Sequence, residues 1–199
     1  METRESILRA AAEVFDESGY AGASINRILE RAGVTAGSLY FHFKSKEALA
    51  RVVIQEQAND LAFPEEAQGL QSLVDMTGYL ASQMQHNTLF RAGVRLAVEQ
   101  SELGLQEYAI YEWWSERFRQ ELVVAREQGQ LMPGVDEAAF ASMLVATFTG
   151  TQIMSQVACG RADLPKRLGD MWRCMLPALT SHHISATLKL PGTEEEATA

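Results

Sequence analysis

The segment GVTAGSLYFHFKSKEAL, residues 33–49, decides the fold of the amino-terminal part of this chain. Its first residue, Gly33, tolerates the left-handed backbone that ends a helix, and the side chain of Thr35 can cap the start of another helix. Apolar residues recur at helical spacing on both sides of this turn. The segment therefore predicts a helix-turn-helix, with one helix over residues 24–32 and a second over residues 35–43.

The second of these helices has two faces of different character. Leu39 and Phe43 lie four residues apart and, together with Val34, are expected to point into a three-helix core. A glycine inside a helix costs roughly 1 kcal/mol relative to alanine, so Gly37 on the opposite face requires a compensating contact. Close approach to base edges in a DNA major groove would supply that contact. We therefore predict a DNA-binding surface made of Thr35, Ala36, Gly37, Ser38, Tyr40, Phe41, His42, Lys44 and Lys46.

The distribution of charge favours specific DNA binding over non-specific binding. The whole chain has a formal net charge of −9, whereas residues 24–51 contain five Lys or Arg and only two Glu. Tyr40 and His42 offer hydrogen bonds to phosphate oxygens, and Lys46 stands at a helix amino terminus that also favours an anion. The alternative interpretation is a helical corner that only forms core, in which the tyrosine and the histidine are incidental.

Helical periodicity continues along nearly the whole chain and predicts an all-α protein. The first helix is expected to stop at Gly19, and Ser45 and Asp136 are expected to cap later helices. Further amphipathic helices are expected over residues 45–62, 66–86, 88–102, 106–128, 136–159 and 164–182. We expect three parts, which are a helix-turn-helix DNA-binding domain (1–46), a ligand-binding and dimerisation domain (47–184) and a disordered acidic tail (185–199).

Several other classes of protein are disfavoured. The two cysteines show no CxxC spacing and the first residues do not resemble a signal peptide, which predicts a cytoplasmic protein. Residues 138–160 carry no charge, but their Ser, Thr and Gln content favours a buried helix over a membrane span. Because catalytic, phosphate-binding and metal-binding motifs are missing, we expect no enzyme activity, cofactor or metal site. A lactone hydrolase and a purely structural helical adaptor remain as rival classes, and neither predicts sequence-specific DNA binding.

The amino-terminal segment resembles the DNA-binding domain of the TetR family of transcriptional repressors. The resemblance rests on AGV at residues 32–34, Gly37, LY-x-HF at residues 39–43 and Lys46–Leu49. It implies a dimer, with a small helix-turn-helix domain on each subunit and an all-helical ligand-binding domain. The dimer is expected to read a pseudo-palindromic operator in double-stranded DNA.

The carboxy-terminal part is similar to one group within this family, the γ-butyrolactone receptors of actinomycetes. The similar segments are FRAGVRLAVEQ (90–100), YEWWSERF (111–118), TGTQIM (149–154) and LGDMWRCMLPAL (168–179). The resemblance implies a repressor that a diffusible autoregulator releases from DNA and that controls antibiotic biosynthesis. It also implies that Trp113 and Thr151 help to form the lactone pocket.

An autoregulator of this kind is small, mostly apolar and uncharged, so it requires an apolar cavity with a few hydrogen-bonding groups. The predicted ligand-binding residues are Trp113, Thr151, Gln57, Met84, Met143 and Gln152. Each of these residues could instead be ordinary core. A receptor-like homologue that responds to antibiotics or other hydrophobic small molecules is the alternative. Two helices per subunit, residues 137–159 and 164–182, are expected to form a four-helix homodimer interface.

Overall fold

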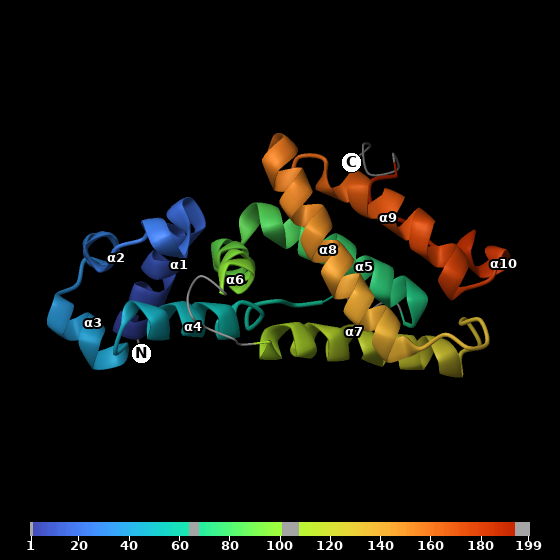
Figure 1. Cartoon of the computed structure of the whole chain (residues 1–199), viewed down its shortest axis with the longest axis horizontal. Helices are drawn as coiled ribbons and strands as arrows, with labels where there is room; N and C mark the ends of the chain where they lie inside the picture. The colour runs from blue at the N-terminus through green and yellow to red at the C-terminus, as the bar shows by residue number, and fades with distance from the viewer. Residues whose placement is uncertain (1, 64–67, 101–107, 194–199) are drawn as a thin grey trace. The chain divides into compact units, whose positions relative to one another are not determined.

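The computed structural model describes residues 2–63, 68–100 and 108–193, and within these ranges it contains ten α-helices and no β-strand (Figure 1). The prediction of an all-α protein is confirmed. The chain divides into two compact units, one made of residues 1–61 and 86–110, the other of residues 62–85 and 111–199.

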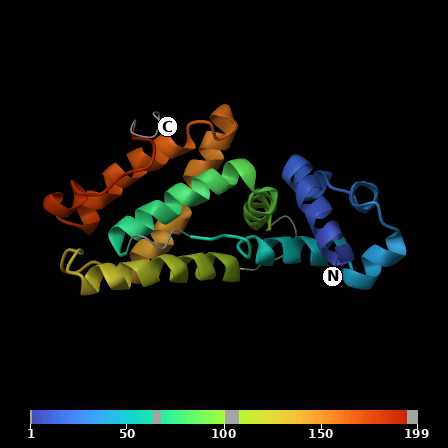
Figure 2. The same ribbon diagram turned by 180° about the vertical axis from the view of Figure 1, so that it is seen from behind.

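The first unit combines four consecutive helices with a fifth from later in the sequence (Figure 2). These helices are α1 (Glu2–Gly22), α2 (Ile25–Ala32), α3 (Ala36–His42), α4 (Lys46–Glu56) and α6 (Thr88–Glu99). The Ser24 side chain accepts the backbone N–H of Arg27 to cap α2, and Gly33 ends this helix with φ 66° and ψ 32°. Thr35 Oγ1 accepts the backbone N–H of Ser38 at 3.3 Å and caps α3. The predicted helix-turn-helix is confirmed, with helix ends within one residue of those expected.

Helix α1 bends at Gly19, the residue at which the sequence predicted its end. Gly19 has φ 66° and ψ −176°, and one further turn follows as far as Gly22. A side chain at this position would be strained by the positive φ, and it would also displace the ends of two α6 side chains. Its Cβ would lie 2.7 Å from Nη2 of Arg95 and 2.8 Å from Oε1 of Glu99. The bend therefore allows α6 side chains to reach the backbone at the end of α1.

Helix α6 also packs closely on α4. A Cβ at Gly93 would lie 2.4 Å from Cβ of Gln57 and 3.0 Å from the carbonyl oxygen of Val53. On its other side, Arg91 of α6 forms an ion pair with Asp16 of α1 at 2.8 Å. Helix α6 therefore joins α1 and α4 within this unit.

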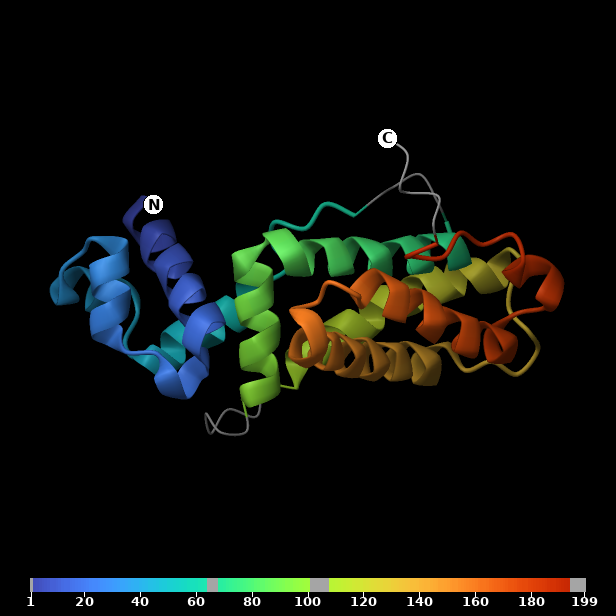
Figure 3. The ribbon, with the colours of Figure 1, turned by 90° about the horizontal axis from the view of Figure 1, so that it is seen from above.

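The second unit holds α5 (Leu70–His86), α7 (Ala109–Glu127), α8 (Glu137–Cys159), α9 (Leu164–Leu179) and α10 (His182–Ser185). Helices α8 and α9 pack on one another (Figure 3). Asp136 caps α8 by accepting two backbone N–H groups at 3.0 Å, as predicted. Trp172 of α9 is fully buried and donates its indole N–H to Thr77 of α5 at 2.8 Å. The hydrogen bond fixes α5 relative to α9.

Several helices are shorter than their apolar patterns predicted, among them α5, which begins at Leu70 because Gln68 and Gly69 are not helical. Helix α4 ends at Glu56, where the Gln57 amide donates to the carbonyl of Ile54 and a turn begins. Helix α9 ends before Thr180, whose backbone is extended. The expected helix ends at residues 66, 102 and 106 lie outside the described residues.

The division by packing differs from the domain boundaries expected from the sequence, because α4 and α6 pack with α1. The boundary at residue 46 stays a prediction. The expectation of disorder is corrected for residues 185–193, since Lys189 exchanges two backbone hydrogen bonds with the Gln71 side chain. Residues 194–199 lie outside the described part of the chain. Among the described helices, none has the length and apolar character required to cross a membrane.

Candidate nucleic-acid interface and ligand-binding residues

Helix α3 presents the face that the sequence assigned to DNA. Leu39 and Phe43 are buried as predicted, at 0% and 4% exposure, and Val34 is half-buried. On the other face, Tyr40 is 51% and Phe41 is 85% exposed. The predicted DNA-contacting residues that are exposed are Thr35, Ala36, Gly37, Tyr40, Phe41, His42 and Lys44, whereas Ser38 and Lys46 are half-buried.

Gly37 has no packing role within the chain. A Cβ at this position would meet only Oγ1 of Thr35, at the ordinary contact distance of 3.9 Å. The helix therefore carries a residue of poor helix propensity that its own fold does not require. The missing side chain therefore leaves the exposed face of α3 open at this position.

Lys46 is tied to the end of α1. Its ammonium group donates to the carbonyl oxygens of Tyr20 and Ala23, both at 2.8 Å, and lies 4.0 Å from the centroid of the Tyr20 ring. A lysine ammonium has three donors, so one remains for a phosphate. Lys46 therefore positions the start of α4 against the helix-turn-helix, whatever contact it makes with DNA.

Glu47 completes this connection. The Tyr20 hydroxyl donates to Oε1 of Glu47 at 2.8 Å. Hydrogen bonds from Ser45 and Tyr20 lower the pKa of Glu47 to about 2, while burial and the Glu47 carboxylate raise the pKa of Tyr20. Sequence reasoning gave Tyr20 no functional role. The one sequence feature that could have indicated a role for Tyr20 is its aromatic ring directly after Gly19, where the first helix was expected to end.

The basic character of this unit is weaker than a count of residues suggests. Arg27 pairs with Glu17 at 3.0 Å, and Arg31 pairs with Glu13 at 3.1 Å and with Glu17 at 2.8 Å. Two of the five cations counted between residues 24 and 51 thus neutralise acidic residues of α1. Among the predicted DNA-binding residues, Lys44 is the exposed lysine.

The six predicted ligand-binding residues are distributed over both units. Gln57 belongs to the first unit, and the other five belong to the second. Gln57, Met84 and Gln152 are buried, at 1%, 1% and 2% exposure, and Thr151 is half-buried. Trp113 and Met143 are 46% and 47% exposed. Within the single chain these last two therefore do not lie in the closed apolar surroundings that the sequence reasoning expected.

Trp114, rather than Trp113, is the buried ring of this pair. Trp114 is 6% exposed, and the two rings meet edge to face with their centroids 4.8 Å apart. Trp114 also contacts Phe118 and Phe63, with centroid distances of 6.0 and 6.3 Å, and Phe63 in turn meets Tyr79 at 5.5 Å. An aromatic cluster therefore lies directly behind Trp113.

Two of the buried residues predicted to bind ligand, Gln57 and Gln152, differ in how their side-chain amides are hydrogen-bonded. Gln57 donates its Nε2 to the carbonyl of Ile54 at 2.8 Å, but its buried Oε1 has no hydrogen-bond partner in the described structure. Gln152 accepts a hydrogen bond from Nε of Arg161 at 3.1 Å. A buried acceptor without a donor is costly, so Gln57 is the better candidate to bind a polar group of a ligand.

Helix α8 leaves an apolar face uncovered. Along one side of it, Met143, Ile153, Met154 and Val157 are 47%, 37%, 63% and 83% exposed. Ala146 and Gly150 lie between them and are also exposed. These positions repeat at about the 3.5-residue spacing of a helix packing seam. We call this set of six residues the α8 stripe.

A helix-turn-helix with an exposed second helix, joined to a larger helical unit, defines a helix-turn-helix transcription regulator. A family model of bacterial regulatory proteins of the tetR family matches residues 7–53. A second model, the tetracyclin repressor-like C-terminal domain, matches residues 67–181. The chain belongs to the tetR family.

Comparison with individual proteins agrees with this membership. The chain is 41% identical to the A-factor receptor protein of Streptomyces griseus, over 96% of this chain and 69% of that protein. It resembles full-length TylP, a TetR regulator from Streptomyces fradiae, with a TM-score of 0.82, 40% identity and coverage of 96% and 92% of the two chains. It also resembles CprB of Streptomyces coelicolor in complex with its operator sequence, with a TM-score of 0.72, 26% identity and coverage of 92% and 91%.

Proposed function

We propose that this protein is a dimeric transcriptional repressor that leaves its operator when a small diffusible autoregulator binds. The autoregulator is of the γ-butyrolactone, butenolide or furan type, and the regulated genes serve antibiotic biosynthesis or other secondary metabolism. The similarity to the A-factor receptor over nearly the whole chain, and to a gamma-butyrolactone receptor structure at 29% identity with a TM-score of 0.72, supports this class of ligand. Because the operator is genomic DNA, the protein acts in the cytoplasm.

One observation carries the DNA-binding part of this proposal: Gly37 lies on an exposed helix face where no contact within the chain requires a glycine. The first turn of α3, Thr35 to Ser38, approaches base edges in the major groove. The phosphate backbone is held by side chains around this turn, namely Tyr40, Phe41, His42, Lys44 and the remaining donor of Lys46.

The α8 stripe supports the homodimer. The stripe exposes four large apolar side chains on one helix face, and a second copy of the chain would bury them. In the dimer, α8 and α9 of each subunit pack as a four-helix interface. The two α3 helices then lie about 34–36 Å apart, or a multiple of this distance, and read a pseudo-palindrome.

The ligand site combines an apolar wall with few polar groups. Met84 and the aromatic cluster behind Trp113 provide apolar surface for the ligand. The predicted set also includes Gln57 of the first unit, whose buried Oε1 can accept a hydrogen bond from a hydroxyl. Thr151 adds a hydroxyl, while Met143 and Gln152 complete the predicted set. The half-exposed Trp113 serves as a ring face for the ligand to cover.

Helix α4 supplies the coupling between ligand and DNA. It begins at Lys46, which holds the end of α1, and the residue after its last turn is Gln57, which packs on Gly93 of α6. A ligand that pairs with Gln57 thus acts on the same helix that positions the helix-turn-helix. The ligand must bind the two states of this helix with different affinity in order to shift them.

A gel-shift titration tests the proposal. The purified protein is titrated onto its own promoter region, with and without a synthetic γ-butyrolactone that bears an alkyl side chain. We expect a specific complex that the lactone dissolves. A complex that only an antibiotic dissolves would favour the receptor-like alternative, and conversion of the lactone without any DNA complex would favour a hydrolase.

A further inference from the structure

The carboxy-terminal segment after α10 returns along the second unit and binds to α5. The backbone N–H of Lys189 donates to Oε1 of Gln71 at 2.9 Å, and Nε2 of Gln71 donates to the carbonyl of Lys189 at 3.1 Å. The side-chain amide of Gln71 therefore forms the pair of hydrogen bonds that the backbone of a neighbouring β-strand would form. We call residues 188–193 the strap.

The structure around the strap is adapted to its backbone. A Cβ at Gly169 of α9 would lie 2.4 Å from the carbonyl oxygen of Pro191. Gly192 has φ 68°, and its Cβ would lie 2.6 Å from the backbone nitrogen of Lys166. On α5, a Cβ at Gly78 would lie at an ordinary contact distance of 3.4 Å from the Pro191 ring. Two glycines, one on α9 and one in the strap, are therefore required by this contact.

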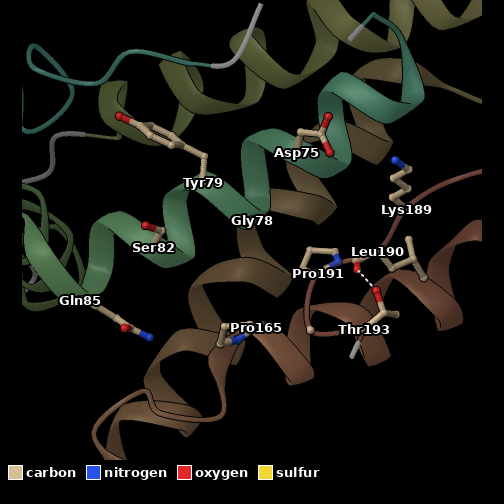
Figure 4. Close-up of a pocket in the computed structure, with 11 residues that line it drawn as sticks. Asp75, Gly78, Tyr79, Ser82, Gln85, Pro165, Lys189, Leu190, Pro191 and Thr193 are labelled. Atoms are coloured by element: carbon tan, nitrogen blue, oxygen red, sulfur yellow. Dashed lines mark hydrogen bonds between the residues drawn. The ribbon is translucent and has the colours of Figure 1, made fainter. Parts of the chain in front are cut away.

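The strap also borders an open cavity of about 610 Å³ (Figure 4). Residues of α5, including Asp75, Tyr79 and Ser82, line one side, and strap residues and Pro165 of α9 line the rest. The strap is thus part of the wall between α5 and α9. Removal of the strap would therefore widen this cavity.

Helix α5 has a second connection, through the chain itself. It ends at His86, and α6 begins at Thr88, so Asn87 alone separates them. Helix α6 has no spare room against the end of α4, where a Cβ at Gly93 would lie 2.4 Å from Cβ of Gln57 and 3.0 Å from the carbonyl oxygen of Val53. Because α6 packs on α1 and α4, a shift at the end of α5 would act through Asn87 on the start of α6 and so on the helices that hold the helix-turn-helix.

We propose that the strap is an intramolecular brace, whose docking between α5 and α9 holds α5 in place and whose release loosens α5 and weakens operator binding. The brace itself is independent of what the protein regulates. Its effect on DNA rests on the proposed repressor function.

The test compares two full-length variants that add one methyl group on either side of the strap. Gly169→Ala places a Cβ into the Pro191 carbonyl and should displace the strap, whereas the Cβ of Gly78→Ala meets the ring of the same proline at an ordinary contact distance and is the matched control. Amide hydrogen exchange is measured on peptides from residues 70–86 and 188–193. We expect exchange in both peptides to be at least 10-fold faster in Gly169→Ala than in wild type, and unchanged in Gly78→Ala.

A second variant distinguishes release of the strap from a folding defect that Gly169→Ala could cause in α9. Gln71→Leu keeps the size of the side chain but removes both hydrogen bonds to Lys189, so it should release the strap while α9 stays intact.

Operator affinity is expected to fall 3- to 10-fold in both release variants and to stay at the wild-type value in Gly78→Ala. If exchange in residues 70–86 is unchanged in both release variants, the brace is refuted. If exchange rises but operator affinity does not change, transmission to the DNA-binding unit is refuted. A wild-type protein that binds no operator would refute the proposed repressor function, and the exchange measurement would still decide on the brace.

Discussion

The ammonium group of Lys46 lies 4.0 Å from the centroid of the Tyr20 ring and donates to the carbonyl oxygens of Tyr20 and Ala23. The sequence predicted that Lys46 binds a DNA phosphate. In the structure, Lys46 connects the start of α4 to the end of α1. Both roles are compatible, because one of its three donors remains. They can be separated by experiment.

Lys46→Ala is expected to lower both the stability of the fold and the affinity for the operator. Hydrogen bonds to a charged group contribute about 1.5–3 kcal/mol, and the partly exposed position of Lys46 favours the lower end of this range.

Lys44→Ala is the matched control, because Lys44 is exposed. This variant should weaken operator binding without changing the melting temperature. Thermal unfolding and operator titrations at several salt concentrations measure both effects. For Lys44→Ala the salt dependence of binding should become shallower by about one charge. A normal melting temperature for Lys46→Ala would contradict the connecting role.

Gly37→Leu should abolish operator binding without loss of stability. Outside the backbone of its own helix, a Cβ at Gly37 would meet only Oγ1 of Thr35, at 3.9 Å, and replacement of a helical glycine commonly stabilises by about 0.5–1 kcal/mol. In the groove, the leucine side chain would hold α3 away from the bases. The comparison of melting temperature with operator affinity in one variant is decisive. A variant that melts normally and still binds the operator would show that α3 does not approach DNA at this residue.

The stability contribution of Glu47 should depend on pH. Its pKa is lowered to about 2 from a usual value of 4.5, so the folded state favours the carboxylate more than the unfolded state does. The contribution is then fully present above pH 4.5 and is lost as the pH falls towards 2. We expect Glu47→Gln to be less stable than wild type near pH 6 and the difference to shrink with acidification. Urea unfolding at several pH values checks this, with Tyr20→Phe as a variant that removes one donor to Glu47. A difference that stays constant from pH 6 to pH 2.5 would contradict the assigned hydrogen bonds.

Met154→Glu should convert a dimer into a monomer. Met154 is 63% exposed in the single chain and lies on the α8 stripe, so in the proposed interface a carboxylate would be buried without a partner. Gln120→Glu adds the same charge at an exposed position on α7, away from the stripe, and should leave the dimer intact. Sedimentation at micromolar concentration measures both. A wild-type monomer under these conditions would contradict the proposed assembly. Thr147→Glu, on the same helix, should also yield monomers or aggregate.

Trp113 and Trp114 should respond differently to removal. Trp114→Ala removes a buried ring and should destabilise the fold by about 3–5 kcal/mol. Trp113→Ala removes a half-exposed ring, so operator affinity and melting temperature should stay close to wild type. If Trp113 stacks on the ligand, the ligand concentration needed for release should rise 10-fold or more, which corresponds to about 1.4 kcal/mol. An unchanged ligand midpoint in a well-folded Trp113→Ala protein would remove Trp113 from the site.

The helix-turn-helix could be predicted from sequence because its signals are local. Gly33, Thr35 and Ser45 act on backbone within a few residues of themselves, and the buried spacing of Leu39 and Phe43 follows from helical periodicity. The carboxy-terminal end of α4 was predicted less well, because the apolar pattern continues beyond Glu56 while the Gln57 side chain turns back to the helix.

Features that depend on distant residues could not be predicted. Trp114 shares a helix face with Phe118, Leu122 and Ala125, so helical periodicity could have indicated that it is the buried ring. Its contact with Phe63, far earlier in the sequence, could not be predicted. The strap has no periodic pattern, and it is held by Gln71, more than a hundred residues earlier in the sequence. Likewise, a count of arginines cannot reveal that Arg31 is paired with acidic residues of α1.

A DNase footprint on the promoter of its own gene tests most directly whether the protein is a ligand-responsive repressor. The purified protein is added with and without an organic extract from a culture of the organism that encodes it. We predict a protected pseudo-palindrome whose half-sites lie about one helical turn of DNA, or a multiple of it, apart, and whose protection disappears with the extract. The absence of any sequence-specific protection, or protection that no extract or small apolar ligand removes, would contradict this function.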